Sequence, residues 1–276
     1  MADVDDFRIY HYDPSLAATI LFIILSTPPT MLHIYQCLAT RTYFLTPLII
    51  GGLFEIVGYT GRAIASTQTP NWTLGPYIMQ SLLLLLAPLC FAATIYIELG
   101  RIVKAVDGEG CCIINLRWLT KLFVAGDVMS FFVQGGGGGI MSHGSNYRLG
   151  SDIIVAGLIL QLVFFGFFIA VAASFDRNIR RHPTTLSRGG LFPWYKHLVT
   201  LYVASALIMV RNIVRLVEYV QGNDGYVLGH EVFLYVFDAL LMLGVVGVFT
   251  VIHPSEIKAM LRGGMVVHNL IQMRHK

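Results

Sequence analysis

Long apolar stretches, separated by short polar segments, follow one another along most of the chain. A helix needs about 20 predominantly apolar residues to cross roughly 30 Å of hydrocarbon. The pattern predicts seven such helices, with expected ranges 15–35, 44–65, 76–97, 118–140, 151–172, 197–217 and 232–252. We therefore expect an all-α fold: a seven-helix transmembrane bundle over residues 15–252, preceded by an N-terminal segment (1–14) and followed by a tail (253–276).

Composition agrees with a bilayer as the solvent. The 276 residues are 55% hydrophobic and 13% charged, with a mean hydropathy of +0.67, whereas soluble domains carry roughly 25% charged residues. The net charge is +3, but the Lys and Arg residues fall between the apolar stretches and form no single patch. We expect membrane lipids or amphiphilic small molecules as partners and no nucleic acid; protein partners stay unknown.

The basic residues predict the orientation, because short loops rich in Lys and Arg stay in the cytoplasm. Most of them lie in the segments 98–117, 173–196 and 253–276, all on one side of the expected bundle. The opposite side has only Arg8 and Arg148 outside the spans. The tail is therefore expected in the cytoplasm and the N-terminal segment outside.

Two features on the loops fit this orientation. Asn71 begins the sequon Asn71-Trp72-Thr73 in an expected outer loop and is a candidate glycosylation site. All four cysteines fall in spans or on the inner side, so no outer disulfide is expected.

Polar residues recur on one face of several expected spans. An ionisable side chain at membrane depth costs on the order of a few kcal/mol, so each should face the bundle interior. Glu55 and Arg62 lie seven residues apart, which is two helical turns, and two other spans repeat this spacing. The candidate site residues are Glu55, Arg62, Asp127, Gln134, Gln161, Arg211, Arg215, Glu218, Glu231 and Asp238.

Alternation of span direction assigns a depth to these side chains. Most map to the outer half of the bundle, while Glu55, Asp127, Gln161 and Asp238 lie nearer its middle. The pattern predicts a polar, ionisable cavity that is deeper on the outer side. The alternative is that buried ion pairs only hold the helices together. The number of charges favours a binding or translocation site.

Five consecutive glycines, Gly135–Gly139, follow Gln134 in the fourth span. Each weakens a helix by about 1 kcal/mol relative to alanine. Close approach of a neighbouring helix is the favoured explanation, and a flexible segment that bends to open an outer gate is the alternative.

Motifs for catalysis, nucleotide binding or metal binding are missing from the sequence. We expect no enzyme activity, no cofactor and no metal. His33 and His253 lie at span ends, and binding of haem or porphyrin through them is the less favoured alternative. The tail beyond His253 contains apolar stretches and is expected to lie on the membrane surface.

The polar signatures, taken in order, resemble the fungal RTA-like family of lipid-translocating exporters, named for resistance to aminocholesterol. The resemblance covers nearly the whole chain. Its motifs are Tyr12-x-Pro14-Ser15, His33, Glu55-x-x-Gly58-Tyr59-x-x-Arg62, Asp127-x-x-Ser130-x-x-x-Gln134, Gly157-x-x-x-Gln161, Arg211-x-x-x-Arg215-x-x-Glu218, Gly222-x-Asp224-Gly225, Glu231-x-x-x-Tyr235-x-x-Asp238 and His253-Pro254.

The resemblance implies export or flipping of sphingoid long-chain bases or related compounds, resistance to amphiphilic toxins and, in one branch, porphyrin uptake. It implies the plasma membrane as the location, with the endoplasmic reticulum or vacuole as alternatives. The sequence leaves a second function open, that of a seven-helix receptor or sensor for a lipid-like ligand. It does not specify the substrate, the energy source or the oligomeric state.

Overall fold

The computed structural model describes residues 14–69, 72–141, 147–188, 193–222, 230–261, 265–267 and 270–272. Long helices dominate this part of the chain, and each expected span overlaps one of them. The long elements are α1 (Leu16–Thr40), α2 (Thr46–Thr67), α3 (Leu74–Ala105), α4 (Leu116–Met141), α5 (Tyr147–Arg181), α7 (Trp194–Gln221) and a composite of α8 (Glu231–Leu234), the π-helical turn η3 (Tyr235–Ala239) and α9 (Leu240–Val251).

Short elements connect or follow these helices. They are η1 (Tyr43–Leu45), η2 (Glu109–Cys111), α6 (Thr185–Arg188), α10 (Ser255–Leu261), β1 (Met265–Val267) and β2 (Leu270–Gln272).

Six helices of the described residues are long and apolar enough to cross a membrane. The six are α1, α2 together with η1, α3, α5, α7, and the α8–α9 composite. The 26-residue α4 is not among them. Its sequence explains this, because Asp127, Gln134 and the five glycines lower its hydropathy.

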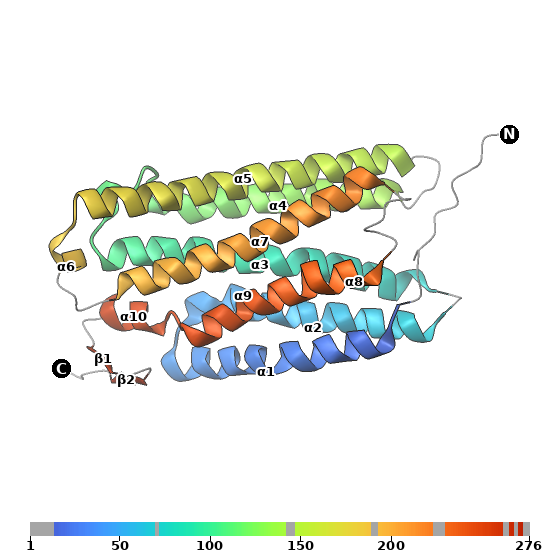
Figure 1. The fold of residues 1–276 in the computed structure, drawn as a ribbon, viewed down its shortest axis with the longest axis horizontal. Coiled ribbons are helices and arrows are strands. Elements are labelled where there is room, and N and C mark those ends of the chain that lie inside the picture. Colours follow the sequence, from blue (N-terminus) through green and yellow to red (C-terminus); the bar gives the residue numbers. More distant parts are fainter. Residues whose placement is uncertain are drawn as a thin grey trace.

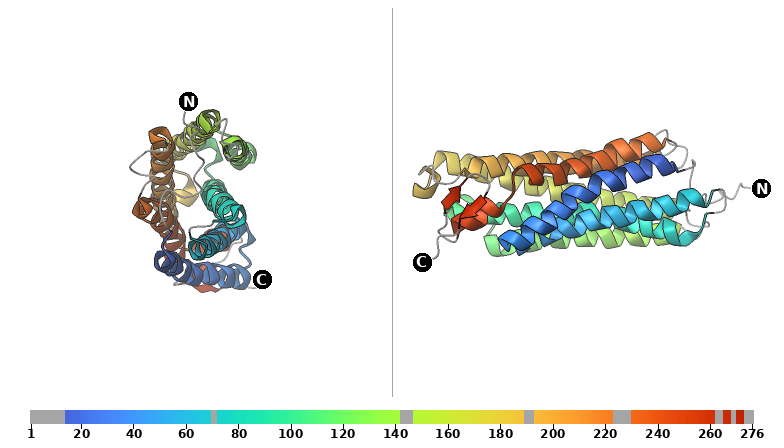
Figure 2. Two further views of the ribbon diagram at one scale, coloured as in Figure 1. Left: turned by 90° about the vertical axis from the view of Figure 1, so that its right-hand side faces the viewer. Right: turned by 90° about the horizontal axis from the view of Figure 1, so that it is seen from below.

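The long helices run nearly along one axis, and neighbours in sequence alternate in direction (Figure 1). We call the end where α1 begins the N-end and the end where α9 finishes the C-end. Seen end-on, α4 and α5 lie on one side of the bundle and α1 and α2 on the opposite side (Figure 2). The central helix is α3, which contacts α2, α4, α7 and α10.

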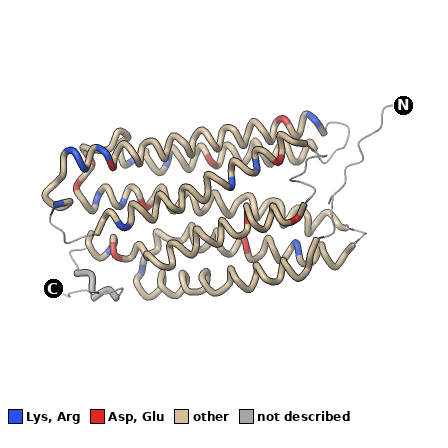
Figure 3. Tube along the Cα trace, viewed as in Figure 1, with Lys and Arg blue, Asp and Glu red and all other residues tan. Residues whose placement is uncertain are grey.

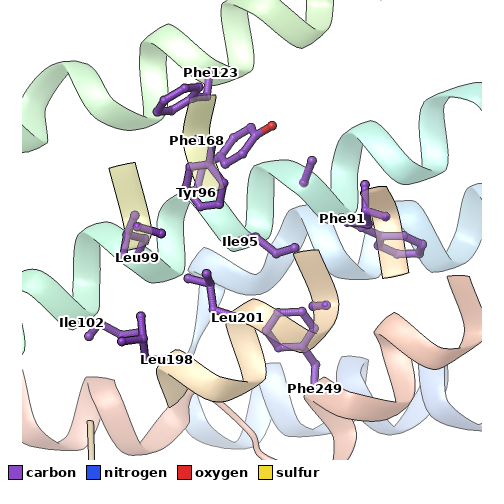
Figure 4. Close-up of a cluster of buried hydrophobic side chains, with 14 of the residues drawn as sticks. Phe91, Ile95, Tyr96, Leu99, Ile102, Phe123, Phe168, Leu198, Leu201 and Phe249 are labelled. Atoms are coloured by element: carbon purple, nitrogen blue, oxygen red, sulfur yellow. The ribbon is translucent and has the colours of Figure 1, made fainter. Parts of the chain in front are cut away.

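Aromatic and branched side chains fill the space around α3 (Figure 4). Tyr96 is fully buried, and its ring lies 4.6 Å from that of Phe168 and 5.4 Å from that of Phe123. Phe91 of α3 and Phe249 of α9 belong to the same buried cluster. This apolar packing fixes α3 against α4, α5, α7 and α9, and so sets the positions of the polar residues on them.

Basic residues gather at the C-end, where α3 and α5 finish and α6 lies (Figure 3). Among them are Lys104, Arg180, Arg181 and Arg188. This is the side that the sequence assigns to the cytoplasm.

The tail adds a short helix and two short strands to the all-α bundle. Residues Ser255–Ala259 of α10 are buried against the bundle. Beyond α10, β1 and β2 pair antiparallel, with Val266 opposite Ile271. These are the two apolar stretches of the tail, separated by only two residues, a spacing that suits a tight hairpin.

The glycine run forms part of a continuous α4 helix. Close helix approach is confirmed for Gly137, where an added Cβ would lie 2.7 Å from the carbonyl oxygen of Gly150 in α5. At Gly135, Gly136 and Gly138 an added Cβ would meet nothing within 4 Å. One of these glycines therefore serves packing directly.

Candidate functional site

An ion pair links α2 to α8 near the N-end. Arg62 of α2 is fully buried and donates to the Glu231 carboxylate at 2.6 Å and to the Tyr235 hydroxyl at 3.1 Å. The backbone N–H of Ser15, the N-cap of α1, donates to both oxygens of Glu231 at 2.9 and 3.1 Å. The Thr19 hydroxyl lies 2.7 Å from that of Tyr235. We call Ser15, Thr19, Arg62, Glu231 and Tyr235 the N-end tie, because they join three helices.

A second ion pair lies deeper in the bundle, between α7 and η3. Arg211 is fully buried; its Nε donates to Asp238 at 2.5 Å and its Nη2 to the carbonyl oxygen of Leu84 in α3 at 3.0 Å. Glu55 of α2 is 3% exposed and within electrostatic range of both Arg211 and Asp238. Arg211, the arginine nearest in electrostatic effect to Glu55, is thus already ion-paired with Asp238.

The π-helical turn η3 contributes to both pairs. Its first residue, Tyr235, belongs to the N-end tie, and Asp238 lies within the same turn. A π turn widens the helix locally and recurs at functional sites. The sequence spacing of Glu231 and Asp238 suggested one regular helical face, and the structure interrupts that face at η3.

The third arginine pairs within its own helix. Arg215 donates to Glu218 at 2.9 Å, one turn further along α7, and lies over the ring of Tyr219. Both members are partly exposed, so this pair contributes less to stability than the two buried ones.

Asp127 of α4 lies apart from these pairs, in the aromatic core. It is 2% exposed, and Oδ2 accepts a hydrogen bond of 2.7 Å from the Tyr96 hydroxyl. Among the described residues Oδ1 has no hydrogen-bond partner. A charged carboxylate buried among aromatic rings is costly unless a proton or a cation neutralises it.

The two glutamines meet between α4 and α5. The side-chain amide of Gln134 donates to Gln161 at 3.0 Å, and both residues are buried. Gly157 allows this contact, since an added Cβ would lie 2.7 Å from the Gln134 side chain. This hydrogen bond uses a donor of one buried amide and the acceptor of the other, and its role in joining α4 to α5 is explained by helix–helix packing alone.

The candidate site contains more acidic side chains than basic ones. Each of the three candidate arginines is ion-paired with a candidate acid, Arg62 with Glu231, Arg211 with Asp238 and Arg215 with Glu218. Among the described residues, Glu55 and Asp127 are left without an ion pair of their own, both buried away from the bundle ends. The site presents two surplus carboxylates near the middle of the bundle.

Several residues of these contacts were not expected to take part. Ser15 and Tyr235 appear in the motifs of the family resemblance, but the sequence assigned them no contact. Thr19 and Tyr96 lie within apolar stretches, and nothing in the sequence pattern marked them as part of the site. Asn71, Tyr12, Asp224 and Gly225 fall outside the described residues.

The histidines at the span ends contact each other near the C-end. The rings of His33 and His253 stack with their centroids 5.9 Å apart, and His33 Nε2 lies 3.0 Å from the Thr250 hydroxyl. Within the described residues no group of three or more His, Cys, Asp or Glu side chains is arranged to bind a metal ion.

Comparison with known proteins gives a consistent result. The model of the family described as RTA1 like protein matches residues 48–260. Protoporphyrin uptake protein 1 of Saccharomyces cerevisiae is 38% identical, over 89% of this chain and 91% of that protein. Protein RTM1 of the same organism is 42% identical, over 79% of this chain and 70% of that protein.

A more distant relative carries a more specific name. Sphingoid long-chain base transporter RSB1 of S. cerevisiae is 23% identical, over 88% of this chain and 72% of that protein. No solved structure matches the chain. The family model and the first two relatives confirm the resemblance found in the sequence, and the chain belongs to the family of RTA1-like membrane proteins.

Proposed function

We propose that this protein translocates lipid-like amphiphiles across the membrane, that its substrates are sphingoid long-chain bases or related cationic amphiphiles, and that this contributes to resistance to amphiphilic toxins. The observation that carries the proposal is the surplus of two buried carboxylates, Glu55 and Asp127, near the middle of a bundle whose arginines are already paired.

Charge complementarity connects this surplus to the substrate class. A buried carboxylate is costly unless a proton or a cation neutralises it. The ammonium group of a sphingoid base is a compact cation with three donors, and it can pair with an acidic side chain while its alkyl chain stays in apolar surroundings. An anionic amphiphile such as a porphyrin would first have to displace Glu231 or Asp238 from an arginine.

The relatives support transport as the type of activity. One is named as an uptake protein and another as a transporter of sphingoid long-chain bases. The proposed activity changes the position of the substrate and leaves its covalent structure intact. Recovery of chemically unchanged lipid after transport tests this point.

The membrane arrangement is part of the proposal. We infer that α4 is a seventh span, because it lies alongside α3 and α5 over the length of the bundle (Figure 1). We place the protein in the plasma membrane, with the N-end outside the cell and the C-end, with its basic residues, on the cytoplasmic side. Protease protection of a tag on either terminus in intact cells tests the orientation.

The experiment for the central claim is flux of a fluorescent sphingoid base across proteoliposomes that contain the purified chain. Glu55→Gln with Asp127→Asn removes both surplus charges at nearly constant volume. The matched control, Glu109→Gln with Asp152→Asn, makes the same chemical changes at two exposed positions.

We expect at least tenfold slower flux in the first variant and unchanged flux in the control. Equal flux in both variants, with equal protein in the vesicles, would refute the role of the two acids. Absence of flux from the unchanged chain, together with saturable binding of the same base, would favour the receptor function instead.

A further inference from the structure

The short helix α10 is packed at the C-end of the bundle, beside the start of α7 (Figure 1). Ile257 is fully buried and belongs to the same apolar cluster as the side chains around α3. Glu256 and Lys258 flank it and are only 7% and 8% exposed. Two charged residues of a seven-residue helix are thus buried, which requires specific partners.

The partners of Glu256 lie on the first turn of α7. Its Oε2 is 3.0 Å from Nε2 of His197, and Nζ of Lys196 donates to both carboxylate oxygens at 3.0 and 3.1 Å. These contacts fix one side of α10 to α7.

The other side of the His197 ring faces a second carboxylate. Nδ1 of His197 lies 3.7 Å from Oε1 of Glu98 in α3, and both residues are fully buried. Among the described residues, neither Glu98 oxygen has a hydrogen-bond partner. An imidazole between two carboxylates can donate to both only when both ring nitrogens carry a proton.

Lys258 fixes the opposite side of α10. Its Nζ donates to the carbonyl oxygens of Thr40 at 2.8 Å and Arg41 at 2.5 Å, at the end of α1. A cation suits these carbonyls, which have no partner within the helix. The helix α10 therefore connects the ends of α1 and α7 across the C-end.

The charged groups around the His197 ring restrict where a proton can bind. Hydrogen bonds from His197 and Lys196 lower the pKa of Glu256 from 4.5 to about 2, so this carboxylate is ionised near neutral pH. Burial lowers the pKa of His253, which precedes α10, to about 4, so its ring is neutral there. His33 of α1 stacks on His253. Among these groups, His197 and Glu98 are therefore the two that can take up a proton near neutral pH.

We infer that Glu98, His197 and Glu256 form a proton-binding site at the C-end, and that a proton bound there keeps α10 docked on the bundle. Without this proton the His197 ring carries no positive charge between the two carboxylates, and Glu98 becomes a buried charge with no cation beside it. Loss of the proton then weakens the attachment of α10 and frees the ends of α1 and α7.

This site stands independently of transport, because it concerns docking of α10 alone. If the proposed function holds as well, the proton site acts at the C-end of the bundle, opposite the N-end tie. A failure of the flux experiment would leave the docking result intact, and the reverse is also true.

The test uses a cysteine at a buried position of α10. Ala259 is 5% exposed, and in the Ala259→Cys chain the labelling rate of that thiol by a maleimide is followed by peptide mass spectrometry. Dividing the rate in a free peptide of the same sequence by the rate in the protein gives a protection factor. This ratio removes the ordinary effect of pH on thiol reactivity.

We expect the protection factor to fall at least tenfold as the pH rises from 5.5 to 8.5. In a His197→Gln background the factor should not depend on pH. In a Glu98→Gln background the transition should move to lower pH, because the protonated ring loses one of its two carboxylates.

Protection that is constant with pH in the chain with native His197, or a transition that persists unchanged in His197→Gln, would overturn the inference. If His197→Gln does not fold, Glu98→Gln still decides, since an unshifted transition in that variant would show that Glu98 has no part in binding the proton.

Discussion

The contact between Gly137 and α5 allows a quantitative prediction. An alanine at residue 137 would place its Cβ 2.7 Å from the backbone oxygen of Gly150 and 2.8 Å from the side chain of Ile154. Because a backbone atom cannot rotate away, α4 and α5 must separate. Gly136 lies one residue earlier in the same run, and an added Cβ there meets nothing within 4 Å.

The two substitutions share one favourable effect and differ in one unfavourable effect. Replacing a glycine inside a helix by alanine stabilises it by about 1 kcal/mol. Overpacking costs about 1–3 kcal/mol and applies to Gly137→Ala alone. The difference in the free energy of unfolding between the two variants should therefore be about 1–3 kcal/mol, with Gly136→Ala the more stable.

Thermal unfolding of the purified variants in one detergent measures this difference. A change of 1 kcal/mol shifts Tm by about 2–4 °C in chains of 150–250 residues, so Gly137→Ala should unfold about 2–12 °C below Gly136→Ala. Equal Tm values would refute the close packing of α4 on α5. They would favour the alternative that the glycines serve flexibility.

Three further predictions concern the buried charges. Asp238→Asn leaves Arg211 buried without its carboxylate and should lower the free energy of unfolding by roughly 3–5 kcal/mol, while adding Arg211→Gln should restore part of the loss in the same denaturation assay. Tyr96→Phe removes the one described hydrogen bond to Asp127 and should cost about 1–3 kcal/mol; an unchanged Tm would contradict this. Glu256 has a pKa of about 2 against an ordinary 4.5, so its contribution is complete above pH 4.5 and is lost as the pH falls through about 2. Pepsin should accordingly leave α10 intact at pH 4 and cleave it below pH 2, whereas Glu256→Gln should be cleaved already at pH 4.

The sequence was sufficient to locate the long helices, because the bilayer demands long apolar segments. It was less informative about their ends. The third expected span covers 76–97, whereas α3 continues to Ala105, and the fifth covers 151–172, whereas α5 continues to Arg181. Polar turns can extend a helix beyond the hydrocarbon, and apolar patterning does not detect them. Glu98 therefore fell one residue outside the expected span, although it is fully buried.

The candidate acids and arginines could be found from the sequence, because an ionisable side chain at membrane depth has a free-energy cost that marks it as functional or paired. The sequence did not show which acid pairs with which arginine. Arg62 was placed on one face with Glu55, seven residues away, and the structure pairs it with Glu231, which is 169 residues away. Pairing across helices depends on rotation and register, and these are set by the apolar packing around α3. The turn η3 also left no trace in the sequence pattern, because a π turn needs one locally shifted backbone register and no particular residue type.

The most direct test of the central claim compares two substrates in the same proteoliposomes, a sphingoid base and its N-acetylated form, which lacks the ammonium charge. If Glu55 and Asp127 select a cation, the charged base should cross at least tenfold faster than the acetylated form. That ratio should fall toward one in the Glu55→Gln, Asp127→Asn variant, and the Glu109→Gln, Asp152→Asn control should preserve it. Equal rates for the two substrates in the unchanged chain would contradict the account, because the surplus carboxylates would then play no part in recognising the substrate.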